Sequence, residues 1–124
     1  MLQPRSIDDF PAQVVHDEGA LGATIRWVIS EAEGSDNYAL RVIELEAGGN
    51  TPHHEHWFEH QNYVIEGQGT VTIGEETFAI KAGDVIFVPG GVRHQYCNTG
   101  SRPLKFLCGI PQAWIKDAKA RREG

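Results

Sequence analysis

Five of the six histidines of the sequence lie in two places. His53, His54, His56 and His60 form one group, and His94 stands alone after a Pro-Gly-Gly turn. On an extended strand, residues two positions apart point to the same face about 7 Å from each other, so the rings of His54 and His56 can converge on one point. Imidazole nitrogen binds Mn, Fe, Co, Ni, Cu and Zn. The spacing therefore predicts a transition-metal site.

The predicted ligands are His54, His56, His60 and His94. His60 follows a reversal of the chain, so a neighbouring strand can direct it toward the other rings, and His94 completes the set from a distant strand. Four protein nitrogens leave two positions open on a six-coordinate ion, where substrate, water or dioxygen can bind. We expect His53 to point away from His54 across the pleat, and the isolated His16 to be an ordinary histidine.

The elements that must position these side chains are short and rich in β-branched and aromatic residues, with Gly, Asn or Pro between them. The eight predicted strands are Thr24–Ser30, Tyr38–Glu46, His60–Glu66, Thr70–Ile73, Thr77–Lys81, Val85–Val88, Val92–Cys97 and Leu104–Ile110. This spacing predicts an all-β sandwich or barrel over about 24–110, with no room for βαβ crossovers.

The two ends of the chain differ from this core. In an N-terminal extension over 1–23, we expect Phe10, Val14 and Val15 to cover an open end of the sheet. In the tail over 111–124, the apolar spacing of residues such as Trp114 predicts a short C-terminal helix packed on the outside. The 124 residues suit one domain, 1–124.

The composition argues against several classes of partner. A formal net charge of −6 disfavours nucleic-acid binding, which needs clustered cations. No apolar run approaches the ~18–20 residues of a membrane helix, and the first residues lack the apolar stretch of a secretory signal. We therefore expect a cytoplasmic protein with no membrane partner, in which Cys97 and Cys108 are reduced thiols.

Two motifs carry a resemblance to a known family. The first is Gly48-x5-His54-x-His56-x3-His60-x6-Gly67, and the second is Gly83-x5-Pro89-x-Gly91-x2-His94-x3-Asn98. In type, spacing and order they resemble the two motifs of the cupins. The resemblance implies a double-stranded β-helix, or jelly roll, with a metal inside its wider mouth, and a homodimer.

The chain departs from the usual cupin pattern at one position. Most cupins carry glutamate where His60 stands. Gln61 is a rival fourth ligand, but it leaves five residues before Gly67 where the pattern has six. A four-histidine set is similar to that of small stand-alone bacterial cupins, which implies Mn or Fe, with Ni, Cu, Co or Zn as alternatives. Because imidazole carries no charge, such a site should favour an anionic ligand.

Further candidates come from strand parity. Arg41 shares a face with Ile43, so it can point inward and bind a substrate carboxylate; an ion pair at the barrel rim or with a subunit neighbour is the alternative. Parity places Asn62 and Tyr96 inside, where they can bond a ligand, orient a histidine or belong to the core. Trp57 and Phe58 stand at the expected mouth of the site, as pocket lining or as loop packing.

These features predict a metal-dependent enzyme acting on a small, anionic organic substrate. Oxygenase or oxidoreductase chemistry comes first, because the motif stretch offers no obvious Asp or Glu general base apart from Glu59, whose parity directs it outward. A metal-dependent lyase or isomerase, with the ion as Lewis acid, is the first alternative. A non-catalytic small-ligand-binding module is the second.

Overall fold

Nine strands form one curled sheet in the part of the chain that the computed structural model describes, residues 3–112. They are β1 (Gln13–Val14), β2 (Leu21–Ile29), β3 (Tyr38–Asn50), β4 (His60–Glu66), β5 (Gln68–Ile73), β6 (Glu76–Lys81), β7 (Val85–Val88), β8 (His94–Cys97) and β9 (Leu104–Pro111). Two short 3-10 turns, η1 (Ile7–Asp9) and η2 (Glu31–Glu33), complete the described elements.

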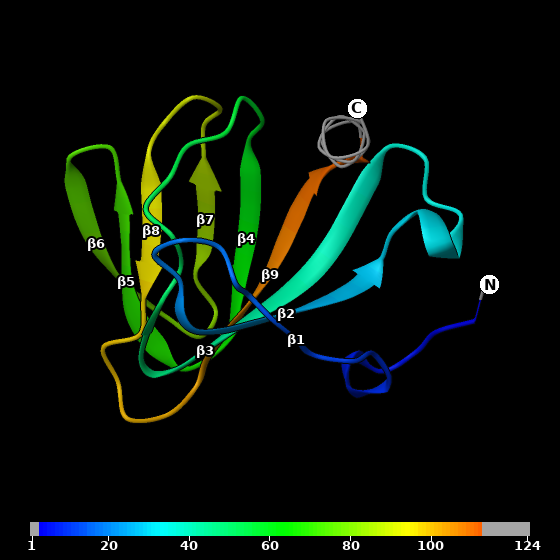
Figure 1. Cartoon of the computed structure of the whole chain (residues 1–124), viewed down its shortest axis with the longest axis horizontal. Helices are drawn as coiled ribbons and strands as arrows, with labels where there is room; N and C mark the ends of the chain where they lie inside the picture. The colour runs from blue at the N-terminus through cyan, green and yellow to red at the C-terminus, as the bar shows by residue number, and fades with distance from the viewer. Residues whose placement is uncertain (1–2, 113–124) are drawn as a thin grey trace.

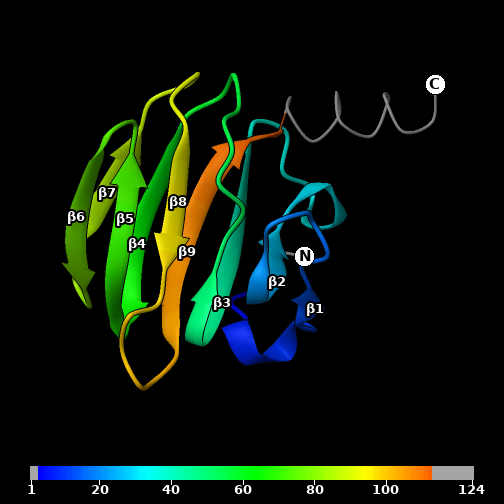
Figure 2. The ribbon, with the colours of Figure 1, turned by 60° about the vertical axis from the view of Figure 1, so that its left-hand side comes forward.

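The long strand β3 joins the two halves of the fold. Residues 38–45 of β3 pair with β9 on one edge, and β2 pairs along the other edge. At its far end Asn50 pairs with Cys97, so β3 also reaches β8. The order is β6-β5-β8-β3-β9-β4-β7, with β2 and then β1 beside β3. Figures 1 and 2 show β6, β5 and β8 at one side of the curl and β2 and β1 at the other.

The structure confirms the all-β jelly-roll prediction and all eight predicted strands. The strands over 60–66 and 85–88 have the predicted bounds. β3 continues to Asn50 instead of ending at residue 46. Gly48 takes a positive φ of 80° there, and beyond it Asn50 pairs with Leu21 of β2 and Cys97 of β8. β1 was not predicted, since a two-residue strand is too short to show alternation. The predicted C-terminal helix, with Trp114, lies outside the described residues.

Alternation along the strands builds the core. Leu104, Phe106 and Cys108 of β9 are at most 1% exposed and point into the curl, as their shared parity predicts. The outer face of β2 and β3 is covered by a second apolar cluster, in which Phe10 packs with Val28 and Val42. The N-terminal segment therefore lies partly over the outside of the sheet, where Phe10 covers a face instead of the expected open end. No helix within residues 3–112 is long and apolar enough to span a membrane.

Candidate metal centre

The two histidine segments are joined backbone to backbone. The amide of His94 donates to the carbonyl of His54 at 2.9 Å, and the amide of His54 donates to the carbonyl of His94 at 3.2 Å. In the turn before β8, the amide of Gly91 donates to the carbonyl of His56 at 2.6 Å. Gly90 permits this approach, because a Cβ at that position would lie 2.3 Å from the carbonyl oxygen of Trp57. The loop before β4 and the turn before β8 therefore hold the three rings in fixed relation.

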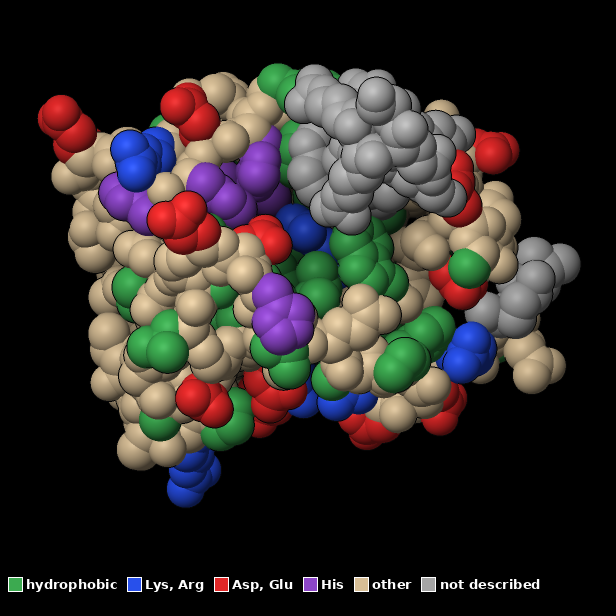
Figure 3. Space-filling model, viewed as in Figure 1, with side chains coloured by type: hydrophobic (Ala, Val, Ile, Leu, Met, Phe, Trp, Pro, Cys, Tyr) green, Lys and Arg blue, Asp and Glu red, His purple; other side chains and the backbone are tan. Residues whose placement is uncertain are grey.

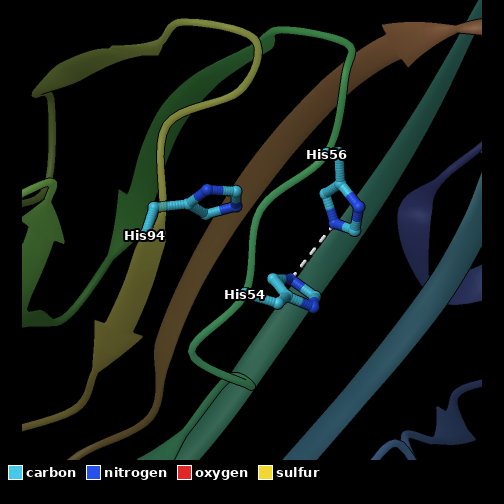
Figure 4. A group of neighbouring side chains, drawn as sticks. All are labelled: His54, His56 and His94. Atoms are coloured by element: carbon cyan, nitrogen blue, oxygen red, sulfur yellow. Dashed lines mark hydrogen bonds between the residues drawn. The ribbon is translucent and has the colours of Figure 1, made fainter.

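Three of the predicted ligands form a compact group. Ring nitrogens of His54, His56 and His94 all lie within 4.8 Å of one another, and the rings face a common space (Figure 4). The Nε2 atoms of His54 and His56 are 3.2 Å apart. Nitrogen–metal bonds of about 2.0–2.1 Å place two ligand nitrogens about 2.9 Å apart at a right angle and about 3.3 Å apart at the tetrahedral angle. The spacing of His54 and His56 fits two ligands of one first-row metal ion.

His60 lies beside this group but is not one of the compact three. It is the first residue of β4 and is 4% exposed, with its ring centroid 4.7 Å from that of His94. Its Nδ1 lies 3.2 Å from the Sγ of Cys108, while its Nε2 is buried and has no hydrogen-bond partner. A buried ring nitrogen without a hydrogen-bond partner fits the role of a metal ligand. Gln61, the rival, is exposed on the opposite face of β4. The assignment of His60 as the fourth ligand stays a prediction.

The histidines are in the protonation state that a metal requires. Burial is the main cause that lowers the pKa of all four rings, to about 4 for His56 and about 2 for His60. The Nδ1 of His94 lies 3.0 Å from the carbonyl oxygen of Val92. A carbonyl only accepts hydrogen bonds, so this contact places the proton of His94 on Nδ1 and leaves the lone pair of Nε2 toward the site.

The histidines form one wall of a cavity of about 470 Å³. Arg41 is the sole Lys or Arg side chain in its described lining, and Asp17 is the sole carboxylate. Ile25, Ile43 and Phe106 contribute apolar surface. In Figure 3 the histidine side chains flank a hollow in which a basic side chain is visible. The volume is within the range of about 300–1,000 Å³ that is usual for small-molecule sites.

Arg41 points into this cavity, on the face that it shares with Ile43. Its guanidinium lies over the ring of Trp27 at 5.6 Å, and its Nη2 donates to the Sγ of Cys108 at 3.5 Å. Its Nε is buried without a hydrogen-bond partner. Arg41 takes part in none of the ion pairs found within residues 3–112, so the rim ion pair that was its alternative role is not formed there. The guanidinium is placed to bind an anion.

The other predicted residues divide into two groups. Asn62 and Tyr96 line the cavity, 5% and 4% exposed. Trp57 and Phe58 do not line it. Phe58 is 3% exposed and stacks on the ring of His56 with centroids 4.6 Å apart, so it packs against a predicted ligand without lining the cavity. Trp57 is 55% exposed. His53 is exposed, as its parity predicts.

Part of the cavity wall is not predictable from the sequence. Trp27 stands directly across from Arg41 in the β2–β3 pairing, and such a register is not readable from the sequence. Residues 13–17, which include β1, also line the cavity. Their place depends on the pairing of Gln13 with Ile25. Val15 does pack against the inner apolar cluster, as its assignment to a covering role predicts.

Comparisons with known proteins agree with this geometry. A family model described as a cupin domain matches residues 41–110. An uncharacterized protein of Methanocaldococcus jannaschii is 39% identical over 71 residues, which make up 56% of this chain and 57% of that protein. The chain thus spans little more than half the length of this curated relative.

Solved structures extend the likeness to most of the chain. The polyketide cyclase RemF from Streptomyces resistomycificus shares 30% identity and a TM-score of 0.85, covering 90% of this chain and 80% of its own. A predicted oxalate decarboxylase from Thermotoga maritima shares 25% identity and a TM-score of 0.79, covering 88% of this chain and 98% of its own. With the curled sheet and the histidine cluster, the family match over more than half of the sequence shows that the protein belongs to the cupin family.

Proposed function

We propose that the protein is a metal-dependent enzyme that uses a divalent ion as a Lewis acid on a small organic anion. The observation that carries this proposal is the shared cavity of the neutral histidines and Arg41. The compact ligand group contains imidazoles alone, and no carboxylate belongs to it. The cavity therefore combines a donor set of zero charge with one fixed cation.

This donor set favours electrophilic chemistry. A divalent metal held by neutral imidazoles keeps its full charge toward the cavity, so it would polarise a substrate oxygen and stabilise negative charge that develops on it. Anionic protein ligands, which support the higher oxidation states of a metal, are missing from the group. For this reason we place Lewis-acid chemistry ahead of the oxygenase chemistry that the sequence puts first.

The protein's own residues bind and orient the substrate. Arg41 lines the cavity, so its guanidinium can hold a carboxylate or enolate there, and the ring of Trp27 holds the guanidinium in place. The apolar surface of residues such as Ile43 lowers the local dielectric beside the site, which strengthens the electrostatic contacts in the cavity. Tyr96 stays a neutral phenol, because burial raises its pKa above the ordinary value.

The comparisons support an enzymatic role of this kind. The names of two similar structures, a polyketide cyclase and a predicted oxalate decarboxylase, describe reactions of oxygen-rich organic compounds. Such compounds carry the carbonyl or carboxylate oxygens that a Lewis acid polarises. The substrate of the present protein belongs, in this proposal, to the same broad chemical class.

The test compares redox-inert and redox-active metals with and without oxygen. Zn²⁺ has no accessible redox chemistry. Protein loaded with Zn²⁺, Mn²⁺ or Fe²⁺ is incubated with small keto acids and hydroxy acids, and consumption is followed by proton NMR. We expect turnover with Zn²⁺ under nitrogen that is absent in His94→Ala and kept in His53→Ala, since His53 is exposed outside the group. Turnover that needs both dioxygen and Mn²⁺ or Fe²⁺ would instead establish the oxygenase.

A further inference from the structure

One chain of hydrogen bonds in the cavity wall has a fixed direction. Asn62 of β4 donates from Nδ2 to the carbonyl oxygen of Leu107 at 3.1 Å. A carbonyl oxygen can only accept, so the amide group of Asn62 has one allowed orientation. Its Oδ1 must then face the other way, and there it accepts the hydroxyl hydrogen of Tyr96.

The hydroxyl of Tyr96 is left with acceptor capacity alone. A phenol has one hydrogen to donate, and Asn62 receives it. The ring of Tyr96 cannot turn away, because it is 4% exposed and stacks on Phe106 with centroids 4.4 Å apart. Since Tyr96 and Asn62 both line the cavity, any ligand that bonds the Tyr96 oxygen must supply the hydrogen.

Arg41 presents the opposite requirement in the same cavity. A guanidinium has only donors, and within residues 3–112 the side chain of Arg41, which lines the cavity, makes a single hydrogen bond, from Nη2 to the Sγ of Cys108. A ligand that bonds this guanidinium must bring an acceptor, and the positive charge favours an anion. The cavity thus suits a ligand that donates a hydrogen bond to Tyr96 and presents an anionic acceptor to Arg41.

We infer that the ligand of this cavity is a small hydroxylated organic anion, whose anionic group binds Arg41 and whose hydroxyl donates a hydrogen bond to Tyr96. This inference rests on the cavity assigned in the proposed function and narrows its substrate class. It makes Tyr96 a specificity-determining residue, which distinguishes a hydroxyl from a group of similar size without a hydrogen to donate. Asn62 acts through Tyr96, as the residue that fixes the direction of the bond.

The test is binding of matched pairs of ligands to Zn²⁺-loaded protein by isothermal titration calorimetry. The probes are 2-, 3- and 4-hydroxybenzoate, each paired with the corresponding fluorobenzoate, which is similar in size but has no hydrogen to donate. We expect at least one hydroxy isomer to bind roughly 2- to 10-fold more tightly than its fluoro partner, the range of one net hydrogen bond. Equal affinities across all three pairs, or no binding of any probe, would contradict the inference.

Variants assign the preference to the residue. Tyr96→Phe keeps the ring and its stacking on Phe106 but removes the acceptor, so the hydroxy and fluoro compounds should bind within about 2-fold of each other. Tyr63→Phe removes a hydroxyl from an exposed tyrosine of β4 and should keep the wild-type preference. Asn62→Leu frees the Tyr96 hydrogen to donate toward the ligand, so it should also reduce the preference. A preference that persists in Tyr96→Phe would overturn the assignment.

The binding readout separates this inference from the proposed function. A protein that prefers the hydroxy compounds, loses the preference in Tyr96→Phe and consumes no substrate would support the inference while contradicting the Lewis-acid enzyme. A protein that turns over keto acids and hydroxy acids alike, with no preference in binding, would do the reverse.

Discussion

His54 and His94 exchange both of their backbone hydrogen bonds, although they belong to separate segments of the chain. The pairing brings the loop before β4 against the first residue of β8, so the backbone sets the distance between the two side chains. The imidazole rings play no part in these two bonds. Removal of a ring should therefore leave the scaffold of the site in place.

The first prediction concerns metal content. His54→Ala and His94→Ala should each lose a ligand of the compact group, and we expect a fall in metal affinity larger than the 10- to 100-fold that is typical when a residue behind a ligand is lost. Elemental analysis of dialysed protein and calorimetric titration with Zn²⁺ measure it. His53→Ala, the exposed neighbour, is the control and should bind as the wild type does. Unchanged affinity in His94→Ala would remove His94 from the ligand set.

The second prediction concerns the anion site. Arg41→Gln removes the charge that faces the cavity, so the affinity for small carboxylates should fall roughly 10- to 100-fold, the range of a charge-assisted hydrogen bond. Titration calorimetry with the hydroxybenzoates measures it. Arg102→Gln removes an exposed arginine elsewhere and should leave the affinity unchanged. If the two variants bind equally well, Arg41 does not hold the anion.

The third prediction concerns Cys108, whose sulfur contacts both His60 and Arg41. For the Nε2 of His60 to bind a metal, its Nδ1 must carry the proton and donate it to that sulfur. Cys108→Ala removes the acceptor and should reduce metal affinity about 10- to 100-fold. Cys108→Ser supplies another acceptor and should restore part of it. Equal loss in both variants would indicate a packing role for the thiol in its apolar cluster.

Side-chain alternation is the part of the site that the sequence reveals best. The inward positions of Tyr96 and Cys108 follow from the two-residue period of a strand once the strand is recognised. What the sequence does not reveal is register. Trp27 meets Arg41 only because β2 and β3 pair in one particular alignment, which depends on distant turns. Phe58 behaves likewise: its place behind His56 depends on how the loop packs, and its neighbour Trp57 points to solvent.

The fourth prediction concerns the pH dependence of stability in metal-free protein. The rings of His56 and His60 have pKa values of about 4 and about 2 in the folded chain, against 6.5 for an unperturbed histidine. Between those folded-state values and 6.5 the unfolded chain binds more protons, so the free energy of unfolding should fall as the pH drops below 6.5. Above that pH these rings should contribute no pH dependence.

Urea unfolding of metal-free protein at about pH 7.5 and about pH 5 measures this loss, on either side of the ordinary histidine pKa. In His60→Gln the difference between the two midpoints should shrink, because one of the protons taken up on unfolding is gone. His53→Gln, changed at an exposed position, should keep most of the difference. An identical pH dependence in wild type and His60→Gln would show that the burial of His60 does not disfavour its protonation.

The last prediction concerns the turn that places His94. A methyl group at Gly90 would lie 2.3 Å from the carbonyl oxygen of Trp57, which is backbone and cannot swing aside. Gly90→Ala should therefore separate the turn from the histidine loop, at a cost of about 1–3 kcal/mol in stability, and should weaken metal binding as the rings move apart. In Gly109→Ala, by contrast, the added methyl would meet its nearest atom at 3.8 Å, an ordinary contact on β9. Thermal unfolding and Zn²⁺ titration of the two variants compare the positions directly. Loss of metal affinity in both, or in neither, would mean that the close approach of Gly90 to Trp57 does not position the ligands.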